Sequence, residues 1–314
     1  MMVCWRPFGN ECWGDTVKRI VITGATGFIG VHLIHTWLRE EAEIYAVIRS
    51  NSKNADLIPV SARVHVVACE MSDYEQLSEL IPDADFFYHL AWEGARAPLR
   101  DNAALQKKNF ECSVKAMDAA NRMGCEFFLG SGSQAEYGNT SGIVDEEYPC
   151  NPTTAYGREK LRTQKELQAM ARNYAMRFIW ARIFSIYGPH DYPGTLIMSA
   201  LDKMKRGEMI EMTAGTQLWD YLYVEDAANA MKLFALQNCE DGIYNVASGD
   251  YRPLNQYLTA MKRVLGSESE LKFGAVPYGP NGPVNLTPSV EKIQKAIYWR
   301  PKMPFEDGIR KMVL

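Results

Sequence analysis

Tyr156 and Lys160 lie four residues apart in the segment AYGREKL, so they share one face of a helix formed there. An ammonium group beside a phenol favours the phenolate and would lower the pKa of the tyrosine. Such a tyrosine can give or take a hydroxyl proton. Ser133, in LGSGSQAEYG, can hydrogen-bond the same substrate oxygen. Tyr–Lys pairs at this spacing are common on helices, so the prediction of proton transfer depends on a cofactor site elsewhere in the chain.

A cofactor site is predicted near the N-terminus, where TGATGFIG follows the apolar run KRIVI. Gly24 would make a tight turn between strand and helix, because glycine adopts backbone angles that a side chain forbids. Gly27 would let a pyrophosphate approach the free N–H groups of the helix N-terminus. Gly30 would let the helix pack closely on the strand. This spacing in a strand–turn–helix context predicts a dinucleotide site; the alternative is a glycine-rich turn without a ligand.

The end of the second strand bears on the choice between NAD and NADP. An acidic residue there would bind the ribose 2′-hydroxyl, whereas an arginine would accept a 2′-phosphate. The strand ends in AVIRSNSKN, with Arg49 and Ser50 in place of the acid. This favours NADP over NAD, although Arg49 could also be a solvated strand-end residue. Glu70 and Met71 follow the third strand and are expected at the adenine edge.

These residues must be positioned by alternating strands and helices, which predict an α/β fold with a Rossmann-like, doubly wound parallel sheet. Residues 190–314 are richer in proline and glycine and predict a smaller C-terminal α/β part that binds substrate. The predicted organisation is an N-terminal leader of unknown role at 1–18, an NAD(P)-binding domain at 19–189, and the substrate-binding region at 190–314, interleaved with the first. Strands are expected at 19–23, 43–49, 63–69, 85–91, 125–131 and 176–183, and helices at 28–41, 74–81, 102–124, 154–174, 195–207, 226–238 and 253–265.

Composition narrows the class of protein. The chain has 314 residues, a net charge of −4 and seven irregularly spaced cysteines. The absence of a basic excess argues against a nucleic-acid partner. No apolar stretch is long enough for a transmembrane helix, and no signal peptide is recognisable, so a cytoplasmic protein without a membrane partner is expected. The cysteines predict structural thiols in a reducing compartment, and no metal site is expected.

Seven motifs occur along the chain in a characteristic order. They are TGATGFIG, HLAW (89–92), GSGSQAEYG (130–138), YGREK (156–160), RIFSIYGP (182–189), WDYLYVEDAA (219–228) and YNVASG (244–249). By their order and spacing the chain resembles an extended short-chain dehydrogenase/reductase of the NAD(P)-dependent nucleotide-sugar epimerase/dehydratase group. The resemblance runs from about 19 to 312, nearly the whole chain.

The resemblance implies roles for individual residues. Tyr156 would be the acid/base, Lys160 would lower its pKa and hold the nicotinamide ribose, and Ser133 would orient the sugar hydroxyl or ketone. The implied substrate contacts are Glu93, Ser133, Gln134, Ser185, His190 and Trp219. The implied cofactor contacts are Gly24, Thr26, Gly27, Phe28, Ile29, Gly30, Arg49, Ser50, Glu70, Met71, Leu90, Ala91, Trp92, Asn109, Ser131, Tyr156, Lys160, Ile183 and Phe184.

Departures from the family pattern bear on the reaction. The 4,6-dehydratases of this group carry an acid two residues after the catalytic serine or threonine, where this chain has Ala135. Glu136 is displaced by one residue, so dehydration is not expected. Ser185 replaces the usual asparagine and Trp219 the usual arginine, which indicates altered sugar or nucleotide contacts. The GSQAEYG form, with HLAW and WDY, is most similar to reductases of nucleotide-linked 4-keto-deoxyhexoses.

Two functions therefore remain open. The first is an NAD(P)-dependent oxidoreductase that acts at C4 of a nucleotide-activated sugar, as a 4-keto-deoxyhexose reductase or a 4-epimerase. The second is a non-catalytic NAD(P)-binding sensor on the same fold, against which the intact Ser133–Tyr156–Lys160 set argues. His89 is expected to be a buried structural histidine, not a base. The apolar stripes of the helices at 102–124 and 154–174 fit a family-type homodimer or a monomer core.

Overall fold

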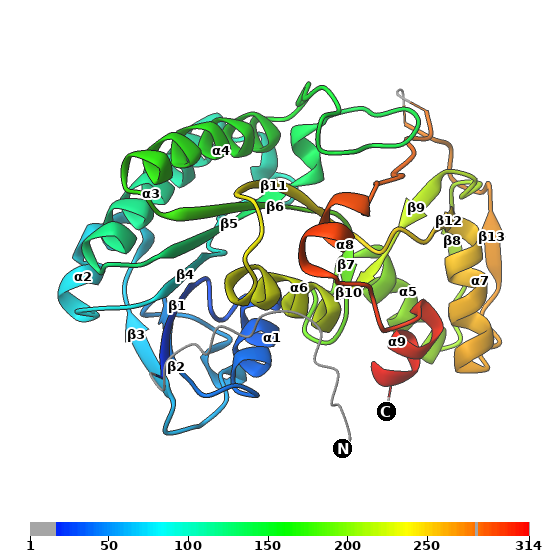
Figure 1. Ribbon diagram of the computed structural model, residues 1–314. Helices are drawn as coiled ribbons and strands as arrows, with labels where there is room; N and C mark the ends of the chain where they lie inside the picture. The colour runs from blue at the N-terminus through cyan, green and yellow to red at the C-terminus, as the bar shows by residue number, and fades with distance from the viewer. Residues whose placement is uncertain (1–16, 280–281, 314) are drawn as a thin grey trace, which may run out of the picture.

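A parallel sheet of seven strands forms the centre of the protein in the computed structural model, which describes residues 17–279 and 282–313 (Figure 1). The strand order is β11-β6-β5-β4-β1-β2-β3. Consecutive strands run outward in both directions from the β1–β4 pair, so the connections that leave the carboxyl ends of β1 and β4 cross opposite faces of the sheet, and such a point leaves a crevice for a ligand. The expected doubly wound Rossmann-like sheet is confirmed. The strands are β1 (Lys18–Thr23), β2 (Ala42–Ile48), β3 (Val64–Ala68), β4 (Phe86–His89), β5 (Phe127–Ser133), β6 (Arg177–Ile183) and β11 (Gly242–Val246).

Helices cover both faces of this sheet, which explains why its central strands are apolar on both sides (Figure 1). One layer contains α2 (Leu77–Leu80), α3 (Ala103–Arg122) and α4 (Ala155–Asn173). The other contains α1 (Phe28–Trp37), α6 (Val224–Leu236) and α8 (Glu291–Ile297). A separate buried apolar cluster fills the space between the sheet and each layer.

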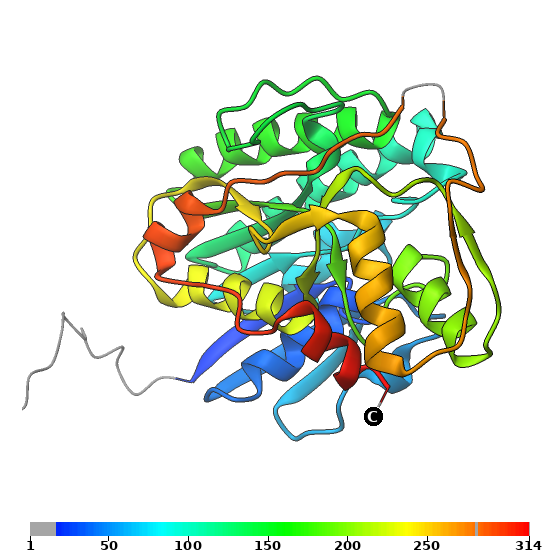
Figure 2. The same ribbon diagram turned by 90° about the vertical axis from the view of Figure 1, so that its right-hand side faces the viewer.

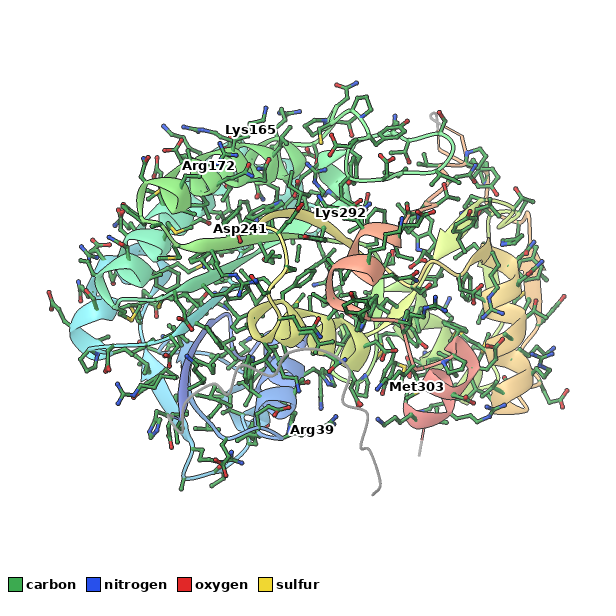
Figure 3. The ribbon with its side chains drawn as sticks, in the orientation of Figure 1. Arg39, Lys165, Arg172, Asp241, Lys292 and Met303 are labelled. Carbon is green, nitrogen blue, oxygen red and sulfur yellow. The ribbon has the colours of Figure 1, made fainter. Side chains whose placement is uncertain are left out.

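The two long helices of the first layer begin at side-chain caps. Asn102 accepts a hydrogen bond from the Leu105 N–H at 3.1 Å, and Thr154 accepts one from the Gly157 N–H at 3.1 Å. Such caps satisfy N–H groups that have no partner inside the helix. Lys165 and Arg172 lie on the outer side of α4 (Figure 3), whereas Tyr156 and Lys160 at its start are buried. The start of α4 is therefore fixed both by a cap and by packing against the sheet.

The C-terminal part packs beside the sheet around an apolar cluster of its own, and α7 and α9 lie side by side in it (Figure 2). Two of its strand pairs are parallel, β7 with β10 and β8 with β13, and the pair β9 with β12 is antiparallel. Its elements are β7 (Ile186–Tyr187), α5 (Leu196–Lys205), β8 (Ile210–Met212), β9 (Leu218–Asp220), β10 (Leu222–Tyr223), β12 (Tyr251–Pro253), α7 (Leu254–Leu265), β13 (Leu271–Phe273) and α9 (Phe305–Lys311).

Two expectations about helices need correction, and a third observation bears on the interleaving of the two regions. The helix expected at 28–41 ends at Trp37, and the Arg63 side chain donates to the Leu38 carbonyl at 2.8 Å just beyond it. The helix expected at 74–81 is a 3₁₀ segment, Met71–Gln76, followed by the short α2. The seventh strand, β11, comes from the region 190–314, so that region contributes to the sheet as well as to the smaller part.

Other sequence expectations concern features of the whole chain. No helix within residues 17–279 and 282–313 is both long and apolar enough to cross a bilayer. The five cysteines in the described residues are free thiols. Cys4, Cys12 and residues 1–16 of the predicted leader lie outside the described residues.

Candidate active site

The glycine turn after β1 has the geometry of a phosphate cradle. Gly24 has a φ of +69°, and a Cβ there would lie 2.8 Å from the Ala91 backbone nitrogen. At Gly30 a Cβ would lie 2.4 Å from the Gly24 carbonyl oxygen, so α1 packs directly on the turn. At Gly27, the N-cap of α1, no side chain caps the helix, and the residue lines a cavity. The N–H groups at the start of α1 are thus available to an anionic group.

This cavity has a volume of about 880 Å³, which is large enough for a dinucleotide. It lies where the carboxyl ends of β1, β2 and β4 meet. The glycine roles and the cavity at the β1–β4 crevice therefore fit an NAD(P) ligand. Its lining includes ten of the residues predicted to contact cofactor or substrate: Gly24, Thr26, Gly27, Arg49, Glu70, Met71, Leu90, Ala91, Trp92 and Glu93.

The loop after β2 contributes more to this cavity than the sequence prediction contained. Besides Arg49, the lining includes Asn51, Ser52, Lys53 and Asn54. Ser52 is tied to the glycine turn, because its Oγ lies 2.7 Å from Thr26 Oγ1. Residues 49–54 contain no acidic side chain, so this part of the loop is positively charged. The sequence RSNSKN shows this charge, but only the fold shows that five of its six residues line the cavity.

The predicted catalytic side chains converge next to the cavity. Ser133, Tyr156 and Lys160 are all buried, with 9%, 9% and 3% of their surfaces exposed. Trp92, which lines the cavity, lies beside two of them. Its ring centroid is 6.0 Å from that of Tyr156 and 3.7 Å from Lys160 Nζ. Lys160 Nζ also donates to the Ser131 carbonyl at 2.6 Å.

The acid–base properties differ from the sequence prediction. Burial raises the pKa of Tyr156, and hydrogen bonding to Ser133 and the positive charge of Arg100 partly oppose that rise. Lys160 Nζ lies 5.9 Å from the Tyr156 ring centroid and donates its hydrogen bond to the Ser131 carbonyl instead. Burial lowers the pKa of Lys160 itself to about 7. The expected lowering of the tyrosine pKa by Lys160 is therefore wrong in this structure, because desolvation is the larger effect.

Glu136 is held in a buried ion pair. One carboxylate oxygen accepts from Arg182 Nε at 2.8 Å, and the other accepts from the Ser133 backbone N–H at 2.7 Å. Trp180 Nε1 donates to the same carboxylate at 3.0 Å. Because its oxygens are occupied, Glu136 cannot serve as the acid that a dehydratase requires. The sequence expectation that it points elsewhere agrees with these contacts.

The lining of a smaller cavity of about 170 Å³ includes Gln134 and Trp219, two of the predicted substrate contacts. Ser185 is tied to this wall, since Trp219 Nε1 donates to its Oγ at 2.9 Å. His190 does not join them, because it lines a different hollow with His32 and His35 of α1. Arg100 lines the smaller cavity and was not predicted from the sequence.

Several predicted cofactor contacts are not among the residues that line the 880 Å³ cavity, and some of them hold residues that do line it. Asn109 is buried and donates to the Glu93 carbonyl at 2.8 Å, which holds the loop after β4. The Ser50 N–H donates to Glu70 at 3.0 Å. Ser131 holds Lys160, and Gly30 packs against the turn. Three others, Ile29, Ile183 and Phe184, belong to the apolar core, and Phe28 packs edge-on to His32.

His89 is a structural residue. Its Nδ1 lies 2.9 Å from Thr23 Oγ1 and its Nε2 lies 2.9 Å from Ser113 Oγ. Ser113 Oγ donates to the Asn109 carbonyl, so the Nε2 of His89 must be the donor to Ser113. Burial lowers the pKa of His89 to about 3, and the ring is neutral. Within the described residues, no group of three or more His, Cys, Asp or Glu side chains could hold a metal ion.

A doubly wound sheet with a glycine turn at β1 and a buried Ser–Tyr–Lys set on the neighbouring elements defines an extended short-chain dehydrogenase/reductase. Residues 20–247 match the sequence profile of the NAD dependent epimerase/dehydratase family. The chain belongs to that family, whose members are enzymes.

Individual relatives are distant. CDP-abequose synthase from Salmonella muenchen is 22% identical over 95% of this chain and 98% of its own. UDP-glucuronic acid decarboxylase 1 from Xenopus tropicalis is 24% identical over 94% of this chain and 71% of its own. The crystal structure of UDP-glucose 4-epimerase from Thermotoga maritima with UDP-glucose superposes with a TM-score of 0.84 at 22% identity, covering 94% of this chain and 97% of that one. At these identities the structural likeness shows the shared fold, and the reaction must be argued from the site.

Proposed function

We propose that this protein is an NAD(P)-dependent oxidoreductase that acts at C4 of a nucleotide-activated sugar. The observation that supports it most is the convergence of Ser133, Tyr156 and Lys160 at one end of the dinucleotide-sized cavity, with Trp92 between the cavity and the lysine. Buried proton-transfer groups beside a cofactor cavity suit hydride chemistry, which requires water to be excluded. The names of the relatives, which include a CDP-sugar and two UDP-sugars, support a nucleotide-sugar substrate.

Each side chain has a role in this proposal. The Tyr156 hydroxyl donates a proton to the C4 carbonyl oxygen during reduction, or accepts the C4 hydroxyl proton during oxidation. Ser133 hydrogen-bonds the same oxygen and orients it. Lys160 would hold the nicotinamide ribose. The bound nicotinamide supplies or accepts the hydride.

Reduction of a 4-ketone is the favoured direction, with NADPH as donor. Ala135 and the occupied Glu136 leave no acid to expel water from the sugar, which argues against dehydration. Arg49 and Lys53 line the cavity just after β2, and cations there suit a 2′-phosphate. The second candidate is 4-epimerisation with bound NAD, favoured by the epimerase among the related structures. A cytoplasmic location and a homodimer remain part of the proposal.

The proposal is tested by measuring which nicotinamide dinucleotide the protein carries when purified and which one it binds more tightly. The purified protein is denatured, the released nucleotide is assayed, and NADPH and NADH are titrated into the apo-protein by fluorescence. We expect an empty site that prefers NADPH. Near-stoichiometric NAD would favour the epimerase and contradict the reductase. Binding of neither dinucleotide would contradict the cofactor site itself.

A further inference from the structure

The segment between β4 and α3 carries a second cationic group to the active site. Two side chains of α3 hold this segment. Gln106 Nε2 donates to the carbonyls of Gly94 at 2.9 Å and Leu99 at 3.1 Å, and Asn109 holds Glu93. At its end, Asp101 accepts from the backbone N–H of Ala155, the first residue of α4, at 3.1 Å. The residue before Asp101 is therefore fixed against the helix that carries Tyr156.

That residue is Arg100. Its guanidinium carbon lies 5.1 Å from the Tyr156 ring centroid. Its Nε is buried and has no hydrogen-bond partner among the described residues. Arg96, one turn earlier, differs in this respect, because its guanidinium reaches Asp191 at 3.4 Å. A buried guanidinium nitrogen without an acceptor is unfavourable unless a ligand supplies one.

The cavity that Arg100 lines is otherwise uncharged. Of the described residues that line the 170 Å³ cavity, Arg100 is the only charged one. Trp219 also lines this cavity, and its indole N–H is satisfied by Ser185 at 2.9 Å. The Trp219–Ser185 pair therefore offers no cation to a substrate, whereas Arg100 does.

We propose that Arg100 binds an oxyanion of the substrate beside Tyr156. The inference rests on the proposed function, because it assigns to the same site an anionic nucleotide-sugar. Two oxyanions have this chemistry, the diphosphate of the nucleotide and a carboxylate on the sugar, and both match the planar fork of a guanidinium. Arg100, in the segment between β4 and α3, thus supplies the cation for substrate binding in this cavity.

The test compares wild type with Arg100→Gln by calorimetric titration, in the presence of whichever nicotinamide dinucleotide binds more tightly. The probes are UDP, CDP, dTDP and GDP, their glucose esters, and UDP-glucuronate. Lys107→Gln, which removes a charge from the exposed face of α3, is the matched control. Melting temperature and dinucleotide affinity establish that each variant is folded. Arg100→Lys is the second variant should Arg100→Gln fail to fold.

We expect the tightest probe to bind Arg100→Gln about 10- to 100-fold more weakly, and Arg100→Lys several-fold more weakly, with Lys107→Gln unchanged. A loss already seen with the free diphosphate identifies the diphosphate. A loss confined to UDP-glucuronate identifies a carboxylate. Equal binding by wild type and the Arg100 variants overturns this inference alone. Failure of every probe to bind the dinucleotide-loaded wild type overturns the proposed function and this inference together.

Discussion

At the scale of single residues, Tyr156 is the group on which the proposed chemistry depends. Replacing Tyr156 by Phe removes the hydroxyl and leaves the ring against Trp92 and Arg100. We expect turnover to fall by about 10²- to 10⁴-fold, because general acid–base catalysis contributes that much. The affinity for NADPH should change far less than turnover, because the substitution keeps the aromatic ring and leaves the residues that line the larger cavity in place. Steady-state kinetics and fluorescence titration measure the two quantities.

Tyr298→Phe is the control for this substitution, because Tyr298 is 90% exposed and belongs to neither cavity. It should leave both quantities unchanged. A Tyr156→Phe variant with full turnover would contradict the acid/base role. The sensor alternative would be supported if the wild type showed no turnover and Tyr156→Phe bound the dinucleotide as tightly as the wild type does.

Residue identity and spacing predicted part of the site. The glycines at Gly24 and Gly30 and the Tyr156–Lys160 pair follow from local rules, because each depends on one turn or one helix. The sequence could not show that Lys160 lies on the Trp92 ring, since these residues come from different elements. Arg100 was missed for the same reason. Its position depends on hydrogen bonds from α3 and α4 to a loop without a motif of its own.

At the scale of elements, the buried pair Glu136–Arg182 links the ends of β5 and β6 beneath Ser133. Replacing Glu136 by Gln would leave the Arg182 charge buried without its partner. Breaking a buried pair in this way reduces the free energy of unfolding by about 3–5 kcal/mol. We expect a loss of that order for Glu136→Gln in urea unfolding, together with loss of activity, because glutamine has one acceptor oxygen for the two donors, Arg182 Nε and the Ser133 backbone N–H, that the carboxylate satisfies.

An exposed pair provides the comparison. Glu291 and Lys295 lie one helical turn apart on α8, and both side chains are more than 70% exposed. Glu291→Gln should change the free energy of unfolding by less than about 0.5 kcal/mol. The double variant Glu136→Gln/Arg182→Met should recover part of the stability lost by Glu136→Gln. If Glu136→Gln were as stable as Glu291→Gln, the pair would not anchor these strands.

Element types were predictable where a long periodic pattern and a cap coincide, as in α3 and α4. They were less predictable where a tertiary contact sets the boundary. The residues after Trp37 continue the helical pattern, yet Arg63 binds their carbonyls and the chain turns. Strand β11 has only five residues and is far from β6 in the sequence, so its place beside β6 depended on the whole sheet.

At the scale of the whole molecule, the sheet order could be expected from the alternation of strands and helices, but the way the C-terminal part packs could not. Its strand pairs are two or three residues long, and the residues of its apolar cluster come from β7, α5, β8, β10, α7 and α9. Such contacts join segments far apart in sequence, which no local period encodes. Trp219, a predicted substrate contact, packs against this cluster, and its surroundings were therefore the least predictable part of the candidate site.

The stability of the whole molecule should also depend on pH through Lys160. Burial lowers the pKa of Lys160 from 10.5 to about 7. Between these values the unfolded chain binds a proton that the folded protein has released, so the free energy of unfolding rises with pH there. Below about pH 7 both states are protonated, and the full desolvation penalty destabilises the fold. Lys160→Met removes this titration.

We therefore expect the stability of Lys160→Met relative to wild type to be greater at pH 6 than at pH 9, by on the order of 2 kcal/mol. Urea unfolding of the cofactor-free protein at the two pH values measures this difference. Lys107→Met, on the exposed face of α3, is the matched control for the substitution. An equal effect of Lys160→Met at both pH values would contradict a lowered lysine pKa. The expected result would mean that the fold keeps a buried lysine that lowers its own stability. A lysine with a pKa near 7 suits a site where that side chain gains or loses its proton near neutral pH.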